Sequence, residues 1–136
     1  MPEPPVLISA CLLGINTRYD GGNRQNDELL EQLKGRTLIP VCPEQLGGMP
    51  TPRPPSSLQG CSGEQVLSGR APVINAAGRD VTQEFIRGAH ETLLIATKLG
   101  VKEAYFKSRS PSCGLDPLGV AAALLRRYGI EVHEVE

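Results

Sequence analysis

The sequence predicts an α/β fold with a mostly parallel open sheet and helices on both faces, in a Rossmann-like three-layer arrangement. Short apolar runs alternate along the chain with segments whose apolar residues recur at helical spacing. The first run, residues 6–12, is apolar almost throughout, which is typical of a strand buried on both faces. The length of 136 residues suits one hydrophobic core, so we expect a single domain over 1–136 in which residues 1–5 are flexible.

The individual elements follow from the same patterns. Strands are predicted at residues 6–12, 37–42, 103–107 and 130–133. Helices are predicted from Asn26 or Asp27 to Lys34, from Asp80 to Leu99 and from Asp116 to Tyr128. Glycine follows each helix and proline follows Asp116, as is usual at helix ends and starts. The longest helix should bury a stripe consisting of Val81, Phe85, Ala89, Thr92, Leu93 and Ala96.

Three further segments lack a clear helical or strand pattern. Residues 15–25 contain an Asp-Gly-Gly-Asn turn and are predicted to form a loop. Residues 43–62 are rich in proline and glycine and show no periodicity, so we expect a long ordered loop of functional importance. Residues 65–67 and 72–75 are expected to pair as a small hairpin.

Composition and charge disfavour several functions. Fourteen Lys plus Arg residues against fifteen Asp plus Glu give a formal charge of −1, which creates no field that would draw the protein onto nucleic acid or anionic lipid. No apolar run approaches the roughly 20 residues of a membrane span, and residues 1–5 do not resemble a signal peptide. We therefore expect a cytoplasmic protein with no membrane binding and no generic nucleic-acid binding.

Three of the four cysteines fall at or after the carboxyl ends of predicted strands. Cys11 and Cys42 lie near the ends of the first two strands, and Cys113 follows the strand at 103–107. Ligand sites of open α/β sheets lie at these ends, so we expect the three thiols to meet. The alternative is that they are small buried apolar residues. Cys61, in the proline-rich segment, could complete the set or be a bystander.

Three thiols in one place are typical of a metal site. Soft thiolates select zinc, copper(I) or an iron-sulfur cluster. The chain has no CxxC pair, and its two histidines, His90 and His133, are poorly placed to provide a fourth ligand. These features disfavour a closed structural zinc site and favour three ligands with one open position, which describes a catalytic metal.

Several motifs carry a resemblance to a known family. They are Ser9-Ala-Cys-Leu-Leu-Gly14 with Arg18-Tyr-Asp-Gly21, Pro40-Val-Cys-Pro-Glu44 with Gly47-Gly48 and Pro52-Arg-Pro54, and Lys107-Ser-Arg-Ser-Pro-Ser-Cys-Gly114. In this order they resemble the family catalogued as domain of unknown function 523, whose characterised members are thiouracil desulfidases. The resemblance covers nearly the whole chain.

The resemblance implies a 4Fe-4S cluster held by Cys11, Cys42 and Cys113, with the fourth iron free for the sulfur of a thiolated pyrimidine base or nucleotide. Water would replace that sulfur without net redox change, and sulfide would be released. Glu44 would be the general acid or base, with a pKa raised by the nearby cluster, although an exposed loop carboxylate is the alternative. The partner would be a small molecule and the protein a monomer or homodimer.

The resemblance also implies roles for polar residues near the motifs. Ser112 and Ser110 are expected to aid proton transfer or to orient the ring, although serine beside proline commonly closes a turn. Substrate contacts are expected from Ser108, Arg18, Tyr19, Arg53 and Lys107. The charged members of this set could instead be solvated surface residues, and Tyr19 could be a loop anchor.

Two positions depart from the family pattern. Ser56-Ser57 stands where a glutamate is expected. The loop after Cys113 is shorter than the resemblance leads us to expect, which would widen the pocket, change the choice of substrate or indicate an enzyme that is not a typical desulfidase. Two other functions stay open on sequence alone. One is a non-enzymatic module that binds a cluster or sulfide, and the other is an enzyme in which a single thiolate of low pKa attacks the substrate.

Overall fold

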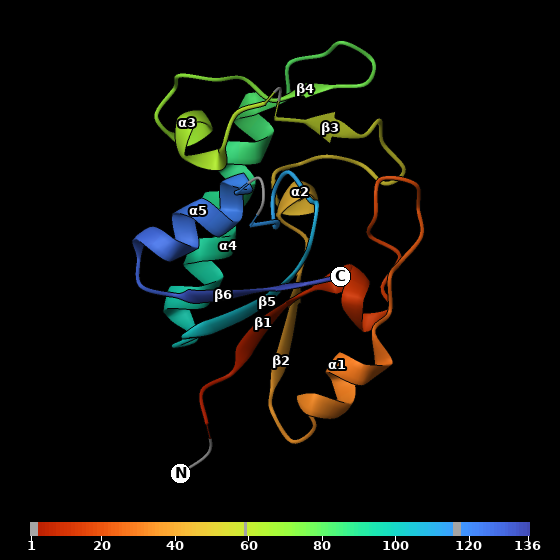
Figure 1. The fold of residues 1–136 in the computed structure, drawn as a ribbon, viewed down its shortest axis with the longest axis vertical. Coiled ribbons are helices and arrows are strands. Elements are labelled where there is room, and N and C mark those ends of the chain that lie inside the picture. Colours follow the sequence, from red (N-terminus) through yellow and green to blue (C-terminus); the bar gives the residue numbers. More distant parts are fainter. Residues whose placement is uncertain (1–2, 59, 116–117) are drawn as a thin grey trace.

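The computed structural model describes residues 3–58, 60–115 and 118–136. Within them, one sheet is formed by the parallel strands β1 (Val6–Ser9), β2 (Leu38–Val41), β5 (Glu103–Lys107) and β6 (Glu131–Val135). The strand order is β2-β1-β5-β6, as Figure 1 shows. Of residues 1–5, which were expected to be flexible, residues 1–2 lie outside the described ranges.

Helices cover both faces of this sheet. The helix α1 (Asp27–Gln32) lies on one side, and α4 (Thr82–Lys98) and α5 (Val120–Arg127) lie on the other (Figure 1). In β1, Leu7 belongs to the core cluster under α4 and α5, whereas Val6 and Ile8 belong to the cluster under α1. All three side chains are fully buried. The predicted parallel sheet between two helical layers is therefore confirmed.

The strand order creates a switch point between β1 and β5. From β1 the chain moves to β2 on one side, and it later returns to form β5 and β6 on the other side. Loops that leave β1 and β5 therefore diverge, and a crevice opens at the carboxyl ends of these strands. The segments that carry Cys11 and Cys113 leave the sheet at this crevice.

The first strand is shorter than predicted. It ends at Ser9, and Ala10–Leu13 form a 3-10 helix that stops at Gly14. Gly14 has a φ of 101°, a conformation that strains any residue with a Cβ. The chain turns here because the backbone N–H of Ile15 donates to the carbonyl oxygen of Ala10 over 3.1 Å. Cys11 consequently lies in a turn beyond the strand.

The segment 43–62 is not one uninterrupted loop. It contains α2 (Pro43–Leu46), which begins with proline at its first turn, and the two-residue strand β3 (Ser56–Ser57). Both elements are too short to show a periodicity in the sequence.

The predicted hairpin between residues 65–67 and 72–75 is wrong. The first of these segments belongs to the helix α3 (Gly63–Leu67), because the Gln65 side chain accepts the Ser62 backbone N–H at 2.9 Å in a capping box. The second contains β4 (Ile74–Asn75), which pairs antiparallel with β3 instead.

The other elements lie near their predicted positions. β5 has the predicted bounds, and β2 and β6 differ from prediction by one or two residues at their ends. α1 ends earlier than predicted, at Gln32, and is capped by Asn26, whose side chain accepts the Leu29 N–H at 2.9 Å. The predicted start of the last helix at Asp116 and Pro117 lies outside the described residues, and α5 itself begins at Val120.

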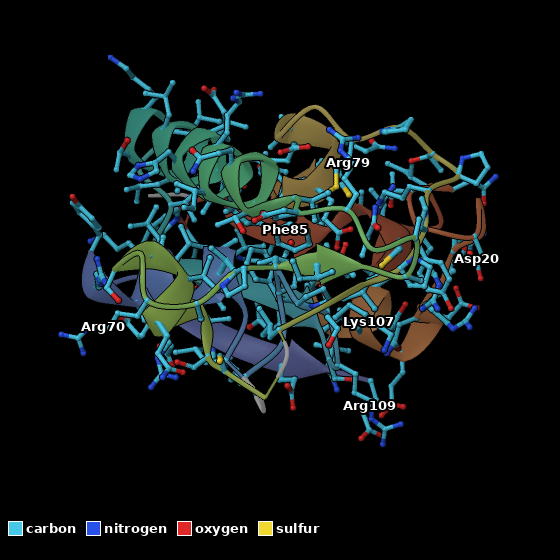
Figure 2. The ribbon with its side chains drawn as sticks, turned by 90° about the horizontal axis from the view of Figure 1, so that it is seen from above. Asp20, Arg70, Arg79, Phe85, Lys107 and Arg109 are labelled. Atoms are coloured by element: carbon cyan, nitrogen blue, oxygen red, sulfur yellow. The ribbon has the colours of Figure 1, made fainter. Side chains whose placement is uncertain are left out.

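The longest helix, α4, begins at Thr82, two residues after the predicted start at Asp80. All residues of the predicted stripe are buried, including Val81, which immediately precedes the helix. Figure 2 shows Phe85 pointing from this helix into the interior. Among the helices of the described residues, none has both the length and the apolar composition needed to cross a membrane.

Candidate active site

A pocket of about 200 Å³ lies at the carboxyl ends of β1, β2 and β5. It brings together every site residue that the sequence analysis singled out, namely Cys11, Cys42, Cys113, Glu44, Ser108, Ser110, Ser112, Arg18, Tyr19, Arg53 and Lys107. These residues come from separate parts of the chain and meet because the parallel strands end at one edge. Cys61 is not among the described residues that line the pocket, and it packs against the main core cluster.

The three pocket cysteines share one desolvated environment. Cys11 and Cys113 are 8% and 5% exposed, and burial raises the pKa of all three thiols. Charge repulsion acts in the same direction: Cys42 raises the pKa of Cys11, and both raise the pKa of Cys113. All three line one pocket, where burial and mutual repulsion both oppose ionisation of the thiols. Without a metal, the thiols are therefore held in their neutral form.

The three pocket thiols fit a multinuclear group better than a single ion. Within residues 3–58, 60–115 and 118–136, the group whose candidate ligand atoms all lie within 4.8 Å of one another is Glu103, Glu131 and His133, on the outer strands. The pocket cysteines do not form such a group, whereas thiolates on one zinc ion lie only about 3.8 Å apart. In an iron-sulfur cluster the cysteines bind different irons and are spread more widely. Three soft thiols that line one pocket without converging on a single point fit a cluster.

Cations lie around the thiols. Arg18 and Lys107 lower the pKa of Cys11, and Arg53 lowers the pKa of Cys42. In each case burial has the larger, opposite effect. Nη2 of Arg53 lies 3.9 Å from Sγ of Cys42. These charges would stabilise thiolates and the net negative charge of a thiolate-ligated cluster.

Ser9 is a pocket residue for which the sequence analysis proposed no role. Its hydroxyl accepts the backbone N–H of Lys107 at 2.9 Å, which ties the end of β1 to the end of β5. A hydrogen bond with Ser9 also lowers the pKa of Cys113, although the opposite effect of burial is larger. Ser9 ends β1, so the strand-end rule that pointed to Cys11 could have identified Ser9 as well.

Close packing between α2 and α4 positions Glu44. Cys42 is the extended residue just before α2, and Glu44 lies in its first turn. A Cβ on Gly47 or on Gly88 would overlap a backbone carbonyl of the opposite helix. Glycine at these two positions therefore allows α2 to lie directly on α4, which sets Cys42 and Glu44 in the pocket wall.

Glu44 forms a partly buried ion pair with Arg53. Nε of Arg53 donates to Oε1 of Glu44 over 3.0 Å, and the two side chains are only 4% and 13% exposed, respectively. Glu44 is therefore not a solvent-exposed loop carboxylate. A carboxylate that lines the same pocket as three thiols gives this pocket both candidate metal ligands and a candidate acid or base.

A comparison with protein families identifies the chain. The model of the family described as 2-thiouracil desulfurase matches residues 6–136. This chain belongs to the 2-thiouracil desulfurase family. The family resemblance predicted from the sequence motifs is thus confirmed.

Two relatives illustrate this membership. "Uncharacterized protein YbbK" of Bacillus subtilis (strain 168) is 36% identical over 140 residues, which cover 93% of this chain and 93% of that protein. The solved structure of the 4Fe-4S-dependent thiouracil desulfidase TudS matches with a TM-score of 0.80 and 37% identity. That match covers 97% of this chain and 91% of the TudS chain, so the two folds agree over almost their full length.

In this member of the 2-thiouracil desulfurase family, the loop that carries Cys113 is held by Ser110. Oγ of Ser110 accepts the backbone N–H groups of Ser112 at 3.2 Å and of Cys113 at 3.1 Å. Such a turn occupies the Ser110 oxygen as an acceptor. Ser112 lines the pocket beside it and is 2% exposed. The two serines, which the sequence did not separate, therefore differ in their surroundings.

The basic residues after β5 also lie at the pocket. Nζ of Lys107 donates to the carbonyl oxygen of Ser108 at 3.2 Å and to its Oγ at 3.3 Å. Burial, and then repulsion from Arg18, lower the pKa of Lys107. Arg109, which the sequence analysis did not single out, lines the same pocket with a φ of 59°. No local pattern marks Arg109, since its place depends on the turn that follows β5. Figure 2 shows Lys107 and Arg109 toward the same end of the molecule.

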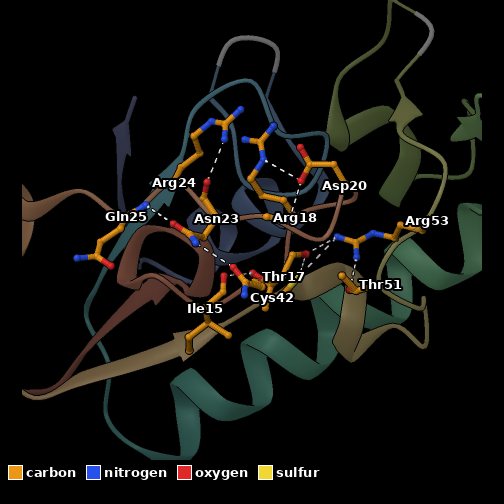
Figure 3. A network of polar contacts seen from close by, with 12 residues as sticks. Ile15, Thr17, Arg18, Asp20, Asn23, Arg24, Gln25, Cys42, Thr51 and Arg53 are labelled. Carbon is orange, nitrogen blue, oxygen red and sulfur yellow. Dashed lines mark hydrogen bonds and ion pairs between the residues drawn. The ribbon is translucent and has the colours of Figure 1, made fainter.

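The loop 15–25 contributes Arg18 and Tyr19. The Arg18 guanidinium lies 5.5 Å from the centroid of the Tyr19 ring, and its Nε lies 3.7 Å from the Asp20 carboxylate. Figure 3 shows the Arg18 side chain directed toward Asp20. The backbone carbonyl of Tyr19 accepts the backbone N–H of Arg53 at 2.8 Å. Tyr19 itself is 40% exposed. Tyr19 thus anchors the loop through its backbone and lines the pocket.

The two positions expected to depart from the family pattern are Ser56-Ser57 and the loop after Cys113. Ser56 lines the pocket, and its Oγ is buried with no hydrogen-bond partner among the described residues. The wall at this position is therefore a neutral hydroxyl. In the loop after Cys113, the carbonyl oxygen of Gly114 accepts the Gly119 N–H at 2.7 Å. Residues 116–117 of that loop lie outside the described ranges.

Proposed function

We propose that this protein is an iron-sulfur-dependent desulfidase that removes sulfur from a thiolated pyrimidine base or nucleotide and releases sulfide. The observation that carries the proposal is the convergence of Cys11, Cys42, Cys113 and Glu44 on one pocket. Membership of the 2-thiouracil desulfurase family and similarity to the 4Fe-4S-dependent TudS support it.

The three pocket cysteines would hold a 4Fe-4S cluster through three of its irons. They line one pocket, Cys11 and Cys113 are buried, and the cations Arg18, Arg53 and Lys107 flank the thiols. When bound, the cluster would supply a soft Lewis-acidic iron with an open position that prefers sulfur over oxygen.

Glu44 would hold and transfer the proton. Arg53 fixes its Oε1 at 3.0 Å, and Oε2 lies outside this hydrogen bond. The carboxylate is thereby oriented to take a proton from an attacking water and return it to the departing sulfur. The water oxygen bonds to the ring carbon, the C–S bond breaks, and its electron pair leaves with sulfur. The thiocarbonyl and water thus become a carbonyl and hydrogen sulfide, with no net oxidation or reduction.

The remaining polar residues would bind the substrate. Arg18, Lys107 and Arg109 make the pocket wall basic, which suits a ring oxygen or a phosphate. Ser112 would orient the ring from beside Cys113. A volume of about 200 Å³ favours a small molecule. We expect the protein to act as a monomer or homodimer.

The other two functions are less well supported. An enzyme with a single nucleophilic cysteine needs a thiolate of low pKa, whereas burial raises the pKa of all three pocket thiols. A module that only carries a cluster or sulfide has no need of a carboxylate that an arginine holds in the same pocket as the cysteines. The ion pair of Glu44 with Arg53 therefore favours the enzyme.

Anaerobic reconstitution tests the proposal. The reconstituted protein should contain about four irons and four sulfides per chain. It should convert 4-thiouracil or its nucleotide with loss of long-wavelength absorption and release of one sulfide per product. A protein that binds iron and sulfide but leaves these compounds unchanged would be a carrier and would refute the enzymatic function.

Single cysteine variants identify the ligands. Cys11→Ser, Cys42→Ser and Cys113→Ser should each lower the iron content and abolish turnover, because a three-ligand cluster depends on every ligand. Cys61→Ser is the matched control, since Cys61 packs against the core away from the pocket lining, and it should keep both properties. Loss of turnover in one pocket variant alone, with iron content unchanged in all, would indicate a nucleophilic cysteine instead.

A further inference from the structure

Arg53 uses its guanidinium entirely within the protein. Nε donates to Oε1 of Glu44 at 3.0 Å. Nη1 donates to the carbonyl oxygen of Pro50 at 3.1 Å and to Oγ1 of Thr51 at 2.8 Å. Nη2 donates to the carbonyl oxygen of Thr17 at 2.9 Å and approaches Sγ of Cys42 at 3.9 Å. Figure 3 shows Arg53 reaching toward Thr51, Thr17 and Cys42.

These contacts account for all the hydrogen-bond donors of the side chain. A guanidinium carries five N–H groups in a fixed fork, and each of the five contacts given above takes one of them. The side chain is only 4% exposed. A substrate phosphate or ring oxygen would have to displace one of these partners in order to bind Arg53. This geometry therefore disfavours the expected contact between Arg53 and the substrate.

The backbone of Arg53 is also hydrogen-bonded within the protein. Its N–H donates to the carbonyl oxygen of Tyr19 at 2.8 Å. Arg53 therefore joins the proline-rich segment to the loop 15–25 through both backbone and side chain. A cation buried in this way is costly unless anions lie against it. Glu44 is one such anion, and a Cys42 thiolate bonded to metal would be a second.

We propose that Arg53 is a positioning residue that joins the proton-transferring carboxylate of Glu44 to the metal-binding sulfur of Cys42. This inference rests on the proposed function and goes beyond it. It states that one arginine both orients the carboxylate that acts as acid or base and changes the electron density on the sulfur of a cluster ligand. The planar fork holds the carboxylate and the sulfur at fixed directions from a single group.

Two consequences follow for the chemistry. Because Nε fixes one oxygen of Glu44, the carboxylate keeps one orientation toward the cysteines, and proton transfer depends on such alignment. An N–H directed at Cys42 withdraws electron density from its sulfur. Hydrogen bonds to cluster sulfurs raise the reduction potential and make the iron a stronger Lewis acid.

Three variants test the inference. Arg53→Met removes the fork and the charge, Arg53→Lys keeps the charge but loses the fork, and Arg126→Met is a control at an exposed position of α5 outside the pocket lining. Each reconstituted protein is examined for iron content, for the reduction potential and electron paramagnetic resonance spectrum of the reduced cluster, and for kcat and KM separately.

A positioning role predicts a particular combination of results. Arg53→Met should lower kcat about 10- to 100-fold with little change in KM, and should shift the reduction potential to more negative values. Arg53→Lys should recover iron content if Arg53→Met loses it, while its kcat stays low because an ammonium cannot hold both partners in the same plane. Arg126→Met should match the wild type in every measurement.

Other results would overturn the inference. A rise in KM with kcat unchanged would mean that Arg53 binds substrate. A reduction potential and spectrum equal to those of the wild type in Arg53→Lys, together with wild-type kcat, would mean that it supports only the fold. In both cases the wild type still binds its cluster and turns over, so the proposed function stands. If the wild type assembles no cluster, the proposed function fails and this inference fails with it.

Discussion

Gly88 of α4 lies directly against the backbone carbonyl of Pro43, the first residue of α2. This backbone contact holds α2 at the pocket, so a glycine that lies outside the pocket lining decides where Cys42 and Glu44 stand.

The first prediction concerns that contact. In Gly88→Ala the new methyl group meets a carbonyl that no side-chain rotation can move aside, so α2 must shift. Overpacking of this kind costs about 1–3 kcal/mol, which outweighs the roughly 1 kcal/mol by which alanine favours a helix over glycine. Urea unfolding should show a lower free energy of unfolding, and turnover should fall as Glu44 moves. Glu91→Ala, at an exposed position of the same helix, is the control and should change neither quantity appreciably.

The second prediction concerns Glu44. Glu44→Gln keeps the size and one acceptor oxygen for Arg53 but cannot take up a proton. The rate should fall about 10²- to 10⁴-fold, as is usual on loss of a general acid or base. Iron content after reconstitution should stay at the wild-type level, because the cysteines are unchanged. Glu28→Gln, on the exposed side of α1, provides the control. Wild-type turnover in Glu44→Gln would remove Glu44 from the mechanism.

The third prediction separates Ser110 from Ser112. In Ser110→Ala the N–H groups of Ser112 and Cys113 lose their acceptor, which should cost about 1–3 kcal/mol and weaken cluster retention. In Ser112→Ala the turn stays intact, so iron content should be kept while turnover falls. Iron analysis, thermal unfolding and rate measurements on both variants distinguish the roles. The reverse assignment would follow if Ser112→Ala lost iron and Ser110→Ala lost only turnover.

The fourth prediction concerns the start of α4. Oδ1 of Asp80 accepts the Thr82 hydroxyl and its backbone N–H, and these hydrogen bonds lower the pKa of Asp80 below its ordinary value of 3.8. Since the folded pKa is the lower one, the charged form stabilises the fold above pH 3.8, and this stabilisation disappears as the pH falls through the folded pKa. The difference in unfolding free energy between wild type and Asp80→Asn should therefore shrink under strongly acidic conditions. A difference independent of pH would show that charge plays no part.

Local patterns in the sequence predicted much of the fold. The helical period of the α4 stripe, the apolar run of β1 and the bounds of β5 each depend on residues close together in the chain, and each was predicted correctly in type. Errors arose where elements are only a few residues long. The capping box of Ser62 and Gln65 was a readable signal for α3, although glycine and serine nearby favoured a turn.

The sequence by itself determined the family, the order of the strands along the chain and the cysteines that follow three of those strands. Tertiary structure alone decided how these parts meet. Short segments such as α2 and the β3–β4 pair are set by packing partners far away in the chain, and sequence periodicity carries no record of such partners. For the same reason, nothing in the sequence distinguishes Arg53 from the other basic residues. Its burial and its ties to Glu44 and Cys42 arise only when the proline-rich segment folds against the loop 15–25.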